Sequence, residues 1–202
     1  AIQVPAGGAP ILLLLPGSRA GEIARMLPVF AGAAQILRKE QTELRCVLMA
    51  APGHEERLKA ATAAWSDPPR IAPAAERADL FAAAQRAMAA SGTVSVELAT
   101  AGVPHVIGYQ VNRLTAFLAR RLIKVPYVNL VNIVLGRALV QELLQERCTP
   151  EELAAACRAL LDPARAAAQK ESFAAAMRLL APEGKSPFER AAEAVLAALP
   201  SA

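Results

Sequence analysis

The stretch Ile11-Leu-Leu-Leu-Leu-Pro-Gly-Ser-Arg19 decides the fold class of this chain. Its five aliphatic residues have a proline on either side, and a short apolar run bounded by turn residues is typical of a strand buried on both faces. After the turn, apolar residues from Ile23 to Leu37 recur at spacings of three and four, which indicates one face of a helix. A buried strand, a tight turn and a helix form the first unit of an α/β fold.

The same alternation continues to Tyr109. Further strands are predicted at 45–50, around residue 71, at 87–90 and at 105–109, and further helices at 53–64, 78–84 and 94–100. Pro28 lies inside the first helix and is expected to kink it or to start a second segment. Strands that alternate with helices through short connections pair in parallel, with helices on both faces. The sequence therefore predicts a doubly wound parallel sheet.

From Leu114 onward helical patterns dominate. Thr149-Pro-Glu-Glu152 and Ser186-Pro-Phe-Glu189 each combine a capping box with a proline at the first helical position. We therefore expect residues 162–202 to form C-terminal helices.

The length and composition exclude several classes of protein. The 202 residues suit one domain, or at most two small ones, and the 54% hydrophobic content with a net charge of only +4 excludes a disordered chain. The longest aliphatic run is far shorter than a membrane span, and no secretory signal opens the chain. Three cysteines without C-x-x-C spacing favour a reducing cytoplasm over disulfides or zinc. The chain begins with Ala1 rather than Met, as a piece of a longer protein would.

The basic balance of the chain, with a pI near 9.3, suggests an anionic partner. The Lys and Arg residues are scattered, and few aromatic residues are present for base stacking, so nucleic acid is not expected. A phosphorylated small molecule or an anionic membrane surface fits the same charge. His54 and His105 stand far apart and form no metal-binding pattern, so no metal site is predicted.

Two turns that follow predicted strands carry the best candidates for ligand binding, because ligands of open α/β sheets bind beyond the carboxyl ends of the strands. In the first turn Gly17 lets the backbone approach a ligand, Ser18 can donate a hydrogen bond and Arg19 can pair with a phosphate. An ordinary tight turn is an equally good interpretation of these residues taken alone.

The second turn is Ser91-Gly92-Thr93. It can open a helix whose backbone amides hold a diphosphate, and Glu97, one helical turn further on, can accept hydrogen bonds from the hydroxyls of a ribose. A solvated helix charge is the alternative for Glu97.

A third cluster of polar residues lies between Val125 and Glu142, within an otherwise apolar stretch. Buried polar groups need partners, and a ligand could supply them, although Asn129 and Asn132 could equally cap turns. Just upstream, residues 113–124 combine apolar with basic side chains, a pattern that suits either an anionic bilayer surface or a core helix with a charged face.

Other nucleotide and hydrolase motifs are missing. No G-x-G-x-x-G follows the first strand, and neither a G-x-S-x-G elbow nor H-E-x-x-H occurs. Gly184-Lys185-Ser186 looks like the end of a P-loop, but Leu179 occupies the place of its first glycine. A dinucleotide site of the nicotinamide or flavin type is therefore not predicted.

Several of these segments together resemble the lipid-A-disaccharide synthase family. They are Leu15-Pro-Gly-Ser-Arg19, Ala90-Ser-Gly-Thr93 through Glu97, Ala119-Arg-Arg-Leu-Ile-Lys-Val-Pro-Tyr127, Gly136-Arg137 and Glu142-Leu-Leu-Gln145. They follow one another in the family's order and spacing, and the resemblance covers about residues 11–161. The turn from Ser91 to Glu97 also resembles related two-domain glycosyltransferases that use UDP-sugars.

The resemblance implies a Rossmann-like, donor-binding C-terminal half of a GT-B glycosyltransferase spanning residues 1–202. The family transfers a 2,3-diacylglucosamine from its UDP derivative to 2,3-diacylglucosamine 1-phosphate, which gives the lipid A disaccharide and UDP. No metal or other cofactor is implied. The lipid acceptor site and the unidentified catalytic residues would lie in an N-terminal half that is absent here. The enzyme would act in the cytoplasm, on the inner face of the inner membrane, and a homodimer is compatible with it.

The same resemblance implies roles for individual residues. Ser18 and Arg19, together with the turn that holds Gly17, would meet the diphosphate, Ser91, Gly92 and Thr93 would form the phosphate-binding turn, and Glu97 would hold the ribose. Asn129, Asn132, Arg137 and Glu142 would help to line the nucleotide site. Where the family pattern has Ser-Leu-Pro-Asn, this chain has Asn129-Leu-Val-Asn132, which leaves the role of Asn129 open.

Two other functions remain compatible with the residues. A stand-alone UDP-sugar-binding module would perform no chemistry, and a sugar-nucleotide epimerase would need acid and base residues inside this domain. The second is disfavoured because His54 and His105 lie outside the candidate turns.

Overall fold

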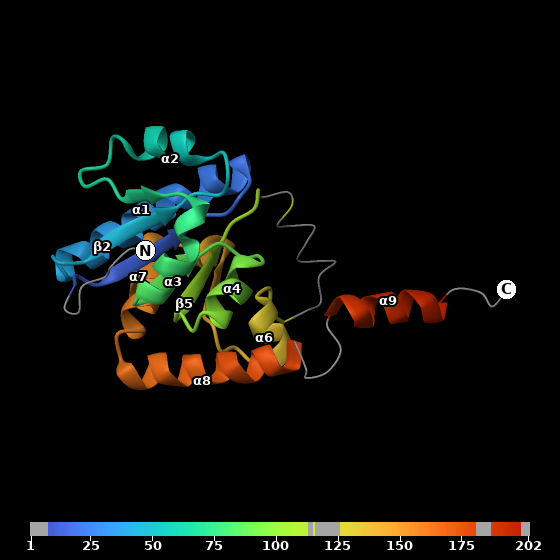
Figure 1. The fold of residues 1–202 in the computed structure, drawn as a ribbon. Helices are drawn as coiled ribbons and strands as arrows, with labels where there is room; N and C mark the ends of the chain where they lie inside the picture. Colours follow the sequence, from blue (N-terminus) through green and yellow to red (C-terminus); the bar gives the residue numbers. More distant parts are fainter. Residues whose placement is uncertain (1–7, 113–114, 116–125, 181–186, 199–202) are drawn as a thin grey trace.

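A computed structural model describes residues 8–112, 115, 126–180 and 187–198 of the chain (Figure 1). The strands are β1 (Ile11–Leu15), β2 (Arg45–Met49), β3 (Arg70–Ala72), β4 (Arg86–Ala89), β5 (His105–Tyr109) and β6 (Glu142–Leu144). The α-helices are α1 (Ala20–Glu40), α2 (Glu55–Thr62), α3 (Arg77–Ala83), α4 (Val94–Thr100), α6 (Leu130–Leu135), α7 (Pro150–Ala159), α8 (Pro163–Leu180) and α9 (Pro187–Ala198). Two 3₁₀ turns, η1 (Ala74–Glu76) and η2 (Gln145–Arg147), complete the described elements.

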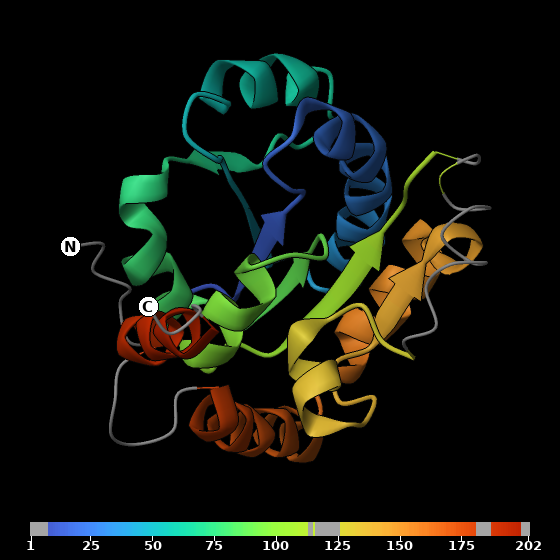
Figure 2. The same cartoon turned by 90° about the vertical axis from the view of Figure 1, so that its right-hand side faces the viewer.

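The six strands form one parallel sheet in the order β3-β2-β1-β4-β5-β6. β1 is central, and the chain winds outward from it first through β2 and β3 and then, on its other side, through β4, β5 and β6 (Figure 2). The predicted doubly wound α/β fold is confirmed. The reversal of direction between β1 and β4 makes their carboxyl ends the expected place for a ligand.

Helices cover both faces of the sheet, as the alternation of β1 side chains requires. Leu12 and Leu14 pack into a core with apolar residues of α1, α2 and α7, whereas Leu13 and Leu15 pack into a second core with residues of α3, α4, α6 and α8. All four of these leucines are buried. The uninterrupted aliphatic run in the sequence is thus the signature of a strand that contributes to two cores.

The first helix differs from the expectation for Pro28. α1 runs without a break from Ala20 to Glu40 with Pro28 inside it, so the expected second segment is wrong. Pro28 and Ala24 lie on the exposed face, where water can hydrogen-bond to the carbonyl group that proline leaves unpaired. Burial of Met26 and Phe30 on the opposite face stabilises the continuous helix.

The second half contains one strand that the helical pattern did not predict. β6 pairs in parallel with β5 through Ile107–Glu142, Gly108–Leu143 and Tyr109–Leu144. With three residues, β6 is too short to show a strand periodicity of its own, so only its pairing with β5 defines it.

The predicted C-terminal helices are confirmed in the described residues. Thr149 caps α7 by accepting a hydrogen bond from Glu152 N, and Pro150 occupies the first turn. Ser186 of the second capping signal lies outside the described residues. α8 is held to β5 by Gln169, whose amide accepts from His105 N at 2.7 Å and donates to His105 O at 3.2 Å.

Candidate functional site

The sheet places the two predicted turns side by side. Leu15 and Ala89 are partners in the β1–β4 register, and Ala90 N donates to Leu15 O at 2.8 Å. The chain therefore leaves both strands at the same edge of the sheet. Residues that are more than seventy positions apart in the sequence face one another there, at the point where the winding direction of the sheet reverses.

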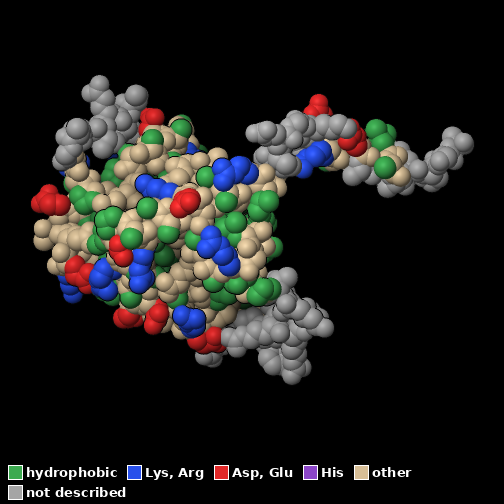
Figure 3. Space-filling model, turned by 90° about the horizontal axis from the view of Figure 1, so that it is seen from below, with side chains coloured by type: hydrophobic (Ala, Val, Ile, Leu, Met, Phe, Trp, Pro, Cys, Tyr) green, Lys and Arg blue, Asp and Glu red, His purple; other side chains and the backbone are tan. Residues whose placement is uncertain are grey.

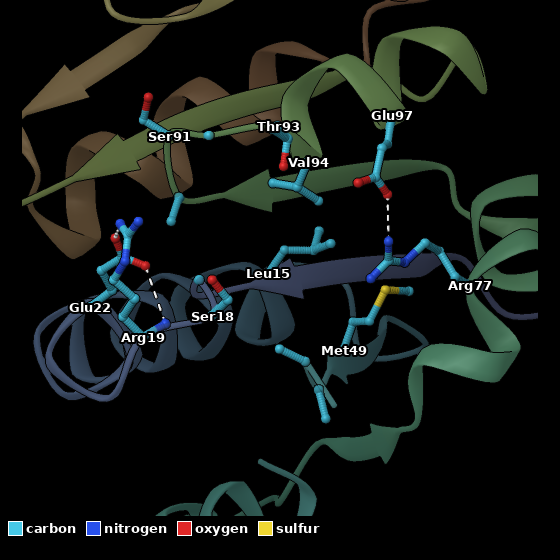
Figure 4. A pocket seen from close by; sticks show the side chains of 15 residues that line it. Leu15, Ser18, Arg19, Glu22, Met49, Arg77, Ser91, Thr93, Val94 and Glu97 are labelled. Carbon is cyan, nitrogen blue, oxygen red and sulfur yellow. Dashed lines mark hydrogen bonds and ion pairs between the residues drawn. The ribbon is translucent and has the colours of Figure 1, made fainter. Parts of the chain in front are cut away.

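A pocket of about 320 Å³ lies between these turns (Figure 4). Seven of the residues proposed from the sequence line it, together with residues from the ends of β2 and α3. The lining residues are Leu15, Gly17, Ser18, Arg19, Glu22, Met49, Ala50, Ala51, Arg77, Ala90, Ser91, Gly92, Thr93, Val94 and Glu97. The fold thus assembles the first two candidate turns and Glu97 into a single cavity.

The first turn is organised by Glu22. Its carboxylate accepts hydrogen bonds from Arg19 N at 3.3 Å and from Arg19 Nη1 at 2.9 Å, which ties the residue before α1 to the first turn of that helix. Burial raises the pKa of Glu22, but hydrogen bonds from Arg19 and the Ser18 backbone lower it below its ordinary value. The Arg19 side chain remains 81% exposed, so its remaining donors can reach a ligand.

Gly17 gives this turn its shape. Its φ of +110° lies in a region that side chains avoid, and a Cβ atom there would come within 2.8 Å of Glu22 Oε2. The glycine is thus required both by the backbone conformation and by the buried carboxylate beside it.

The second turn presents backbone and hydroxyl groups to the pocket. Gly92 has a φ of +153°, and a Cβ atom there would meet nothing within 4 Å. Ser95, the second residue of α4, closes the loop by donating from its hydroxyl to Gly92 O at 2.8 Å. Thr93 makes no side-chain cap, so its hydroxyl is not used to start the helix.

Glu97 has a partner that sequence reasoning missed. Arg77 Nη1 donates to Glu97 Oε2 at 2.7 Å, and each side chain is 38% exposed. Arg77 is the first residue of α3, and no motif in the sequence connects it with a residue twenty positions away. Glu22 was missed for a different reason, because a glutamate in the first turn of a helix also fits a purely structural role.

The third cluster forms a hydrogen-bonded network. Asn132 is fully buried: its Oδ1 accepts from Leu139 N and Val140 N, and its Nδ2 donates to Val140 O and to Glu142 Oε1. The Glu142 carboxylate also accepts from Val128 N at 2.9 Å and from Asn129 N at 3.0 Å. The side-chain polar atoms of Asn132 and Glu142, which were predicted to bind a ligand, thus already have hydrogen-bond partners within the chain.

Asn129 and Arg137 have structural partners as well. Asn129 Oδ1 caps α6 by accepting from Val131 N at 2.8 Å, whereas its Nδ2 is buried without a hydrogen bond in the described part of the chain. Arg137 donates to Ser172 of α8 at 2.7 Å and does not line the pocket between the turns. A second hollow of about 460 Å³ borders Asn132 and Glu142.

The third cluster nevertheless touches the pocket at one point, because Ser91 Oγ donates to Val128 O at 3.3 Å. The loop that Glu142 and Asn132 hold therefore supports the rim of the second turn. The basic segment 113–124, apart from residue 115, lies outside the described residues.

Metal-binding clusters and membrane-spanning helices are both absent from the described residues. Within them, no group of three or more His, Cys, Asp or Glu side chains could hold a metal ion. None of the described helices combines the length and apolar character that a membrane crossing requires.

Comparison with known proteins identifies a family. The family model for lipid-A-disaccharide synthetase matches residues 3–195. The lipid-A-disaccharide synthase of Rhodospirillum centenum is 43% identical over 190 residues, which cover 93% of this chain and 47% of that protein. The chain spans about half the length of the curated relatives it matches.

Solved structures share the fold at low sequence identity. ADP-heptose lipopolysaccharide heptosyltransferase II of E. coli matches with a TM-score of 0.54 at 16% identity, over 77% of this chain and 47% of that one. A Listeria monocytogenes protein assigned as a UDP-N-acetylglucosamine 2-epimerase matches with a TM-score of 0.52 at 17% identity, over 86% and 44%. These likenesses support the α/β fold alone, because a transferase and an epimerase match equally well.

Proposed function

Because the chain belongs to the lipid-A-disaccharide synthase family, we propose that it is the nucleotide-sugar-binding half of a glycosyltransferase of lipid A biosynthesis. The family assignment favours a transferase over an epimerase, which would share only the fold. The single observation that carries the proposal is the pocket between the turns after β1 and β4, where seven residues proposed from the sequence meet.

The proposed reaction is a transfer between two sugars. A hydroxyl of a 2,3-diacylglucosamine 1-phosphate acceptor attacks the anomeric carbon of UDP-2,3-diacylglucosamine. The new glycosidic bond forms as the bond between that carbon and the diphosphate breaks, UDP leaves with the electron pair, and the hydroxyl proton passes to a base. In this proposal the chain holds the UDP part, whereas the acceptor and the base belong to another part of the protein.

The groups in the pocket suit the two ends of UDP. Arg19 can donate to a phosphate from N–H groups that Glu22 leaves unused, and the Ser18 and Thr93 hydroxyls add neutral donors. The Ser91 hydroxyl donates to Val128 O, so Ser91 supports the turn. Gly17 and Gly92 let the backbone approach the ligand closely. The Glu97 carboxylate can accept hydrogen bonds from ribose hydroxyls.

Asn129, Asn132 and Glu142 take a supporting role in this proposal. Their network holds the loop at Val128, which accepts the hydrogen bond from Ser91. Arg137, bonded to Ser172, would act through the packing of α8 instead of by contact with the nucleotide.

Calorimetry with the 202-residue chain tests the proposal. UDP should bind in the presence of excess chelator, because arginine and hydroxyl donors replace a metal in holding the diphosphate. Arg19→Ala should weaken UDP by about 1.5–3 kcal/mol, the range for a hydrogen bond to a charged group, and uridine by much less. Arg45→Ala, an exposed arginine at the opposite end of β2, is the matched control and should change neither.

Three results would overturn the proposal: no binding of UDP, binding that requires magnesium or manganese, or equal losses of UDP and uridine in Arg19→Ala.

We also propose that the whole protein works at the cytoplasmic face of the inner membrane, with a lipid acceptor held by its other half, and that it forms a homodimer. The net charge of +4 and the family's lipid substrates support a peripheral association with an anionic surface. Sedimentation with vesicles that contain phosphatidylglycerol, compared with neutral vesicles, tests the membrane part. Light scattering of the full-length protein tests the dimer.

A further inference from the structure

The ion pair between Arg77 and Glu97 lies at one end of the pocket, away from the Arg19–Glu22 pair at the other end (Figure 4). Arg77 comes from the start of α3 and Glu97 from α4, so the pair joins two helices beyond the carboxyl ends of the strands. Met49, Ala50 and Ala51 line the same pocket and offer no competing charged group. Whatever occupies this end meets one guanidinium and one carboxylate together.

The geometry fixes the Glu97 carboxylate. Arg77 Nη1 holds Oε2 at 2.7 Å, and Figure 4 shows the second oxygen turned away from Arg77. A free glutamate side chain would lose rotamer freedom on binding a ligand, whereas one already held by a charge-assisted hydrogen bond loses less. The guanidinium also offsets the negative charge that Glu97 would otherwise present to an anionic ligand in the same pocket.

Arg77 has a second property that bears on its role. Its Nε is buried and makes no hydrogen bond within the described residues. Buried donors without a partner are uncommon and unfavourable, so the charge-assisted hydrogen bond to Glu97 is the contact that favours this placement of the guanidinium. The nearby Arg70–Glu76 pair provides a contrast, because it is an arginine–glutamate pair of the same region that does not line the pocket.

We propose that Arg77 is a positioning residue that holds the Glu97 carboxylate toward the ribose hydroxyls and thereby makes the pocket select ribonucleotides over deoxyribonucleotides. The inference rests on the proposed function, since it assumes that the pocket takes a nucleoside diphosphate. It adds a residue, and a basis for sugar selectivity, that the sequence motifs do not contain.

Titration calorimetry of the 202-residue chain with UDP, 2′-deoxy-UDP and uridine tests this inference. The parent should bind UDP about tenfold more tightly than 2′-deoxy-UDP, a typical factor for one hydrogen bond to a charged group. Arg77→Ala and Arg77→Gln should each reduce this preference to less than about threefold, and Arg77→Lys should restore part of it. The matched control Arg70→Ala should leave the preference unchanged.

A double variant separates positioning from direct contact. If Arg77 acts through Glu97, adding Arg77→Ala to Glu97→Gln should not lower the preference further, because both changes remove the same interaction. Circular dichroism confirms that each variant is folded, and Arg77→Gln, which keeps most of the side-chain length, replaces Arg77→Ala if that variant is not.

Two outcomes overturn the inference alone: an unchanged preference in a folded Arg77→Gln variant, or a selective loss of UDP relative to uridine, which would make Arg77 a phosphate ligand. Failure of the parent to bind UDP overturns the proposed function, and the inference falls with it.

Discussion

Two arginine–glutamate pairs set the charge of the pocket. Arg19 with Glu22 and Arg77 with Glu97 are its charged lining residues, and their formal charges cancel. A diphosphate bound as proposed would meet no large excess of positive charge, and its binding would depend on directed hydrogen-bond donors. Selectivity for the shape and hydrogen bonding of the ligand follows, because a neutral pocket gives little nonspecific attraction to anions.

Gly17 is the single residue on which this arrangement depends most directly. Gly17→Ala should lower the free energy of unfolding by more than about 2 kcal/mol, since it combines an unfavourable positive φ with a Cβ atom 2.8 Å from Glu22 Oε2. Gly53→Ala is the matched control: its φ is +79°, but no atom lies within 4 Å of the added Cβ. Urea unfolding of both variants measures the difference, and equal losses would contradict a role for the contact with Glu22.

Some residues that line the pocket could be predicted from the sequence, and others could not. Gly17, Ser18 and Arg19 could be identified because one contiguous turn follows an unmistakable strand. Arg77 could not, because its importance arises only when α3 and α4 fold side by side. Residues whose role depends on packing between elements leave no local pattern.

The Asn132 side chain holds the loop between α6 and β6 through hydrogen bonds to its backbone. Asn132→Ala should lower the free energy of unfolding by about 3 kcal/mol, because it leaves backbone groups of Leu139 and Val140 and the Glu142 carboxylate without their partner. Asn112→Ala, in an exposed residue that accepts from Thr115 N, should cost about 1 kcal/mol or less. Chemical denaturation of both tests this, and a loss for Asn132→Ala no larger than that of the control would contradict a structural role.

The helix α8 docks against β5 through a buried histidine. His105 is fully buried, stacks on Phe173 with ring centroids 5.1 Å apart, and has a pKa lowered to about 4 by burial. A depressed histidine pKa means that the unfolded chain binds a proton more readily, so stability falls as the pH drops from about 6.5 toward 4.

The parent chain should therefore lose on the order of 2 kcal/mol of unfolding free energy between pH 7 and pH 5. His105→Asn should remove most of this dependence, and His54→Asn should retain it. Urea unfolding at several pH values measures the slope. A slope that survives in folded His105→Asn would assign the titration to another group.

The elements themselves were predictable to different degrees. β1 to β5 and the helices between them follow from strong apolar patterns with clear turns. β6 could not be predicted, since three residues carry no periodicity and its partner β5 is more than thirty residues away in the sequence. Of the two alternatives for Pro28, the second segment is wrong, because burial of the other face of α1 stabilises one continuous helix.

At the scale of the whole molecule, the proposed function assigns the nucleotide site to this chain and the acceptor site and base to another part of the protein. The 202-residue chain by itself should form no disaccharide from UDP-2,3-diacylglucosamine and 2,3-diacylglucosamine 1-phosphate, although it should bind UDP. Transfer needs an acceptor site and a base within hydrogen-bond reach of the attacking hydroxyl. Thin-layer chromatography of lipid products, with a full-length relative as the positive control, checks the result. Product formed by the chain alone would show that the catalytic groups lie within it.

The central position of β1 has a consequence for the chain during its synthesis. A ribosome delivers the strands in sequence order, whereas the sheet places β4 directly beside β1. A nascent chain that ends before residue 86 contains the first turn of the pocket but not the turn after β4. One edge of β1 is then still unpaired, because β4 is its partner there. If the pocket takes a nucleotide as proposed, affinity should appear only after β4 has emerged and paired with β1, a long-range contact of the kind that forms slowly. Ligand capture by stalled ribosome complexes of increasing chain length would follow that closure directly.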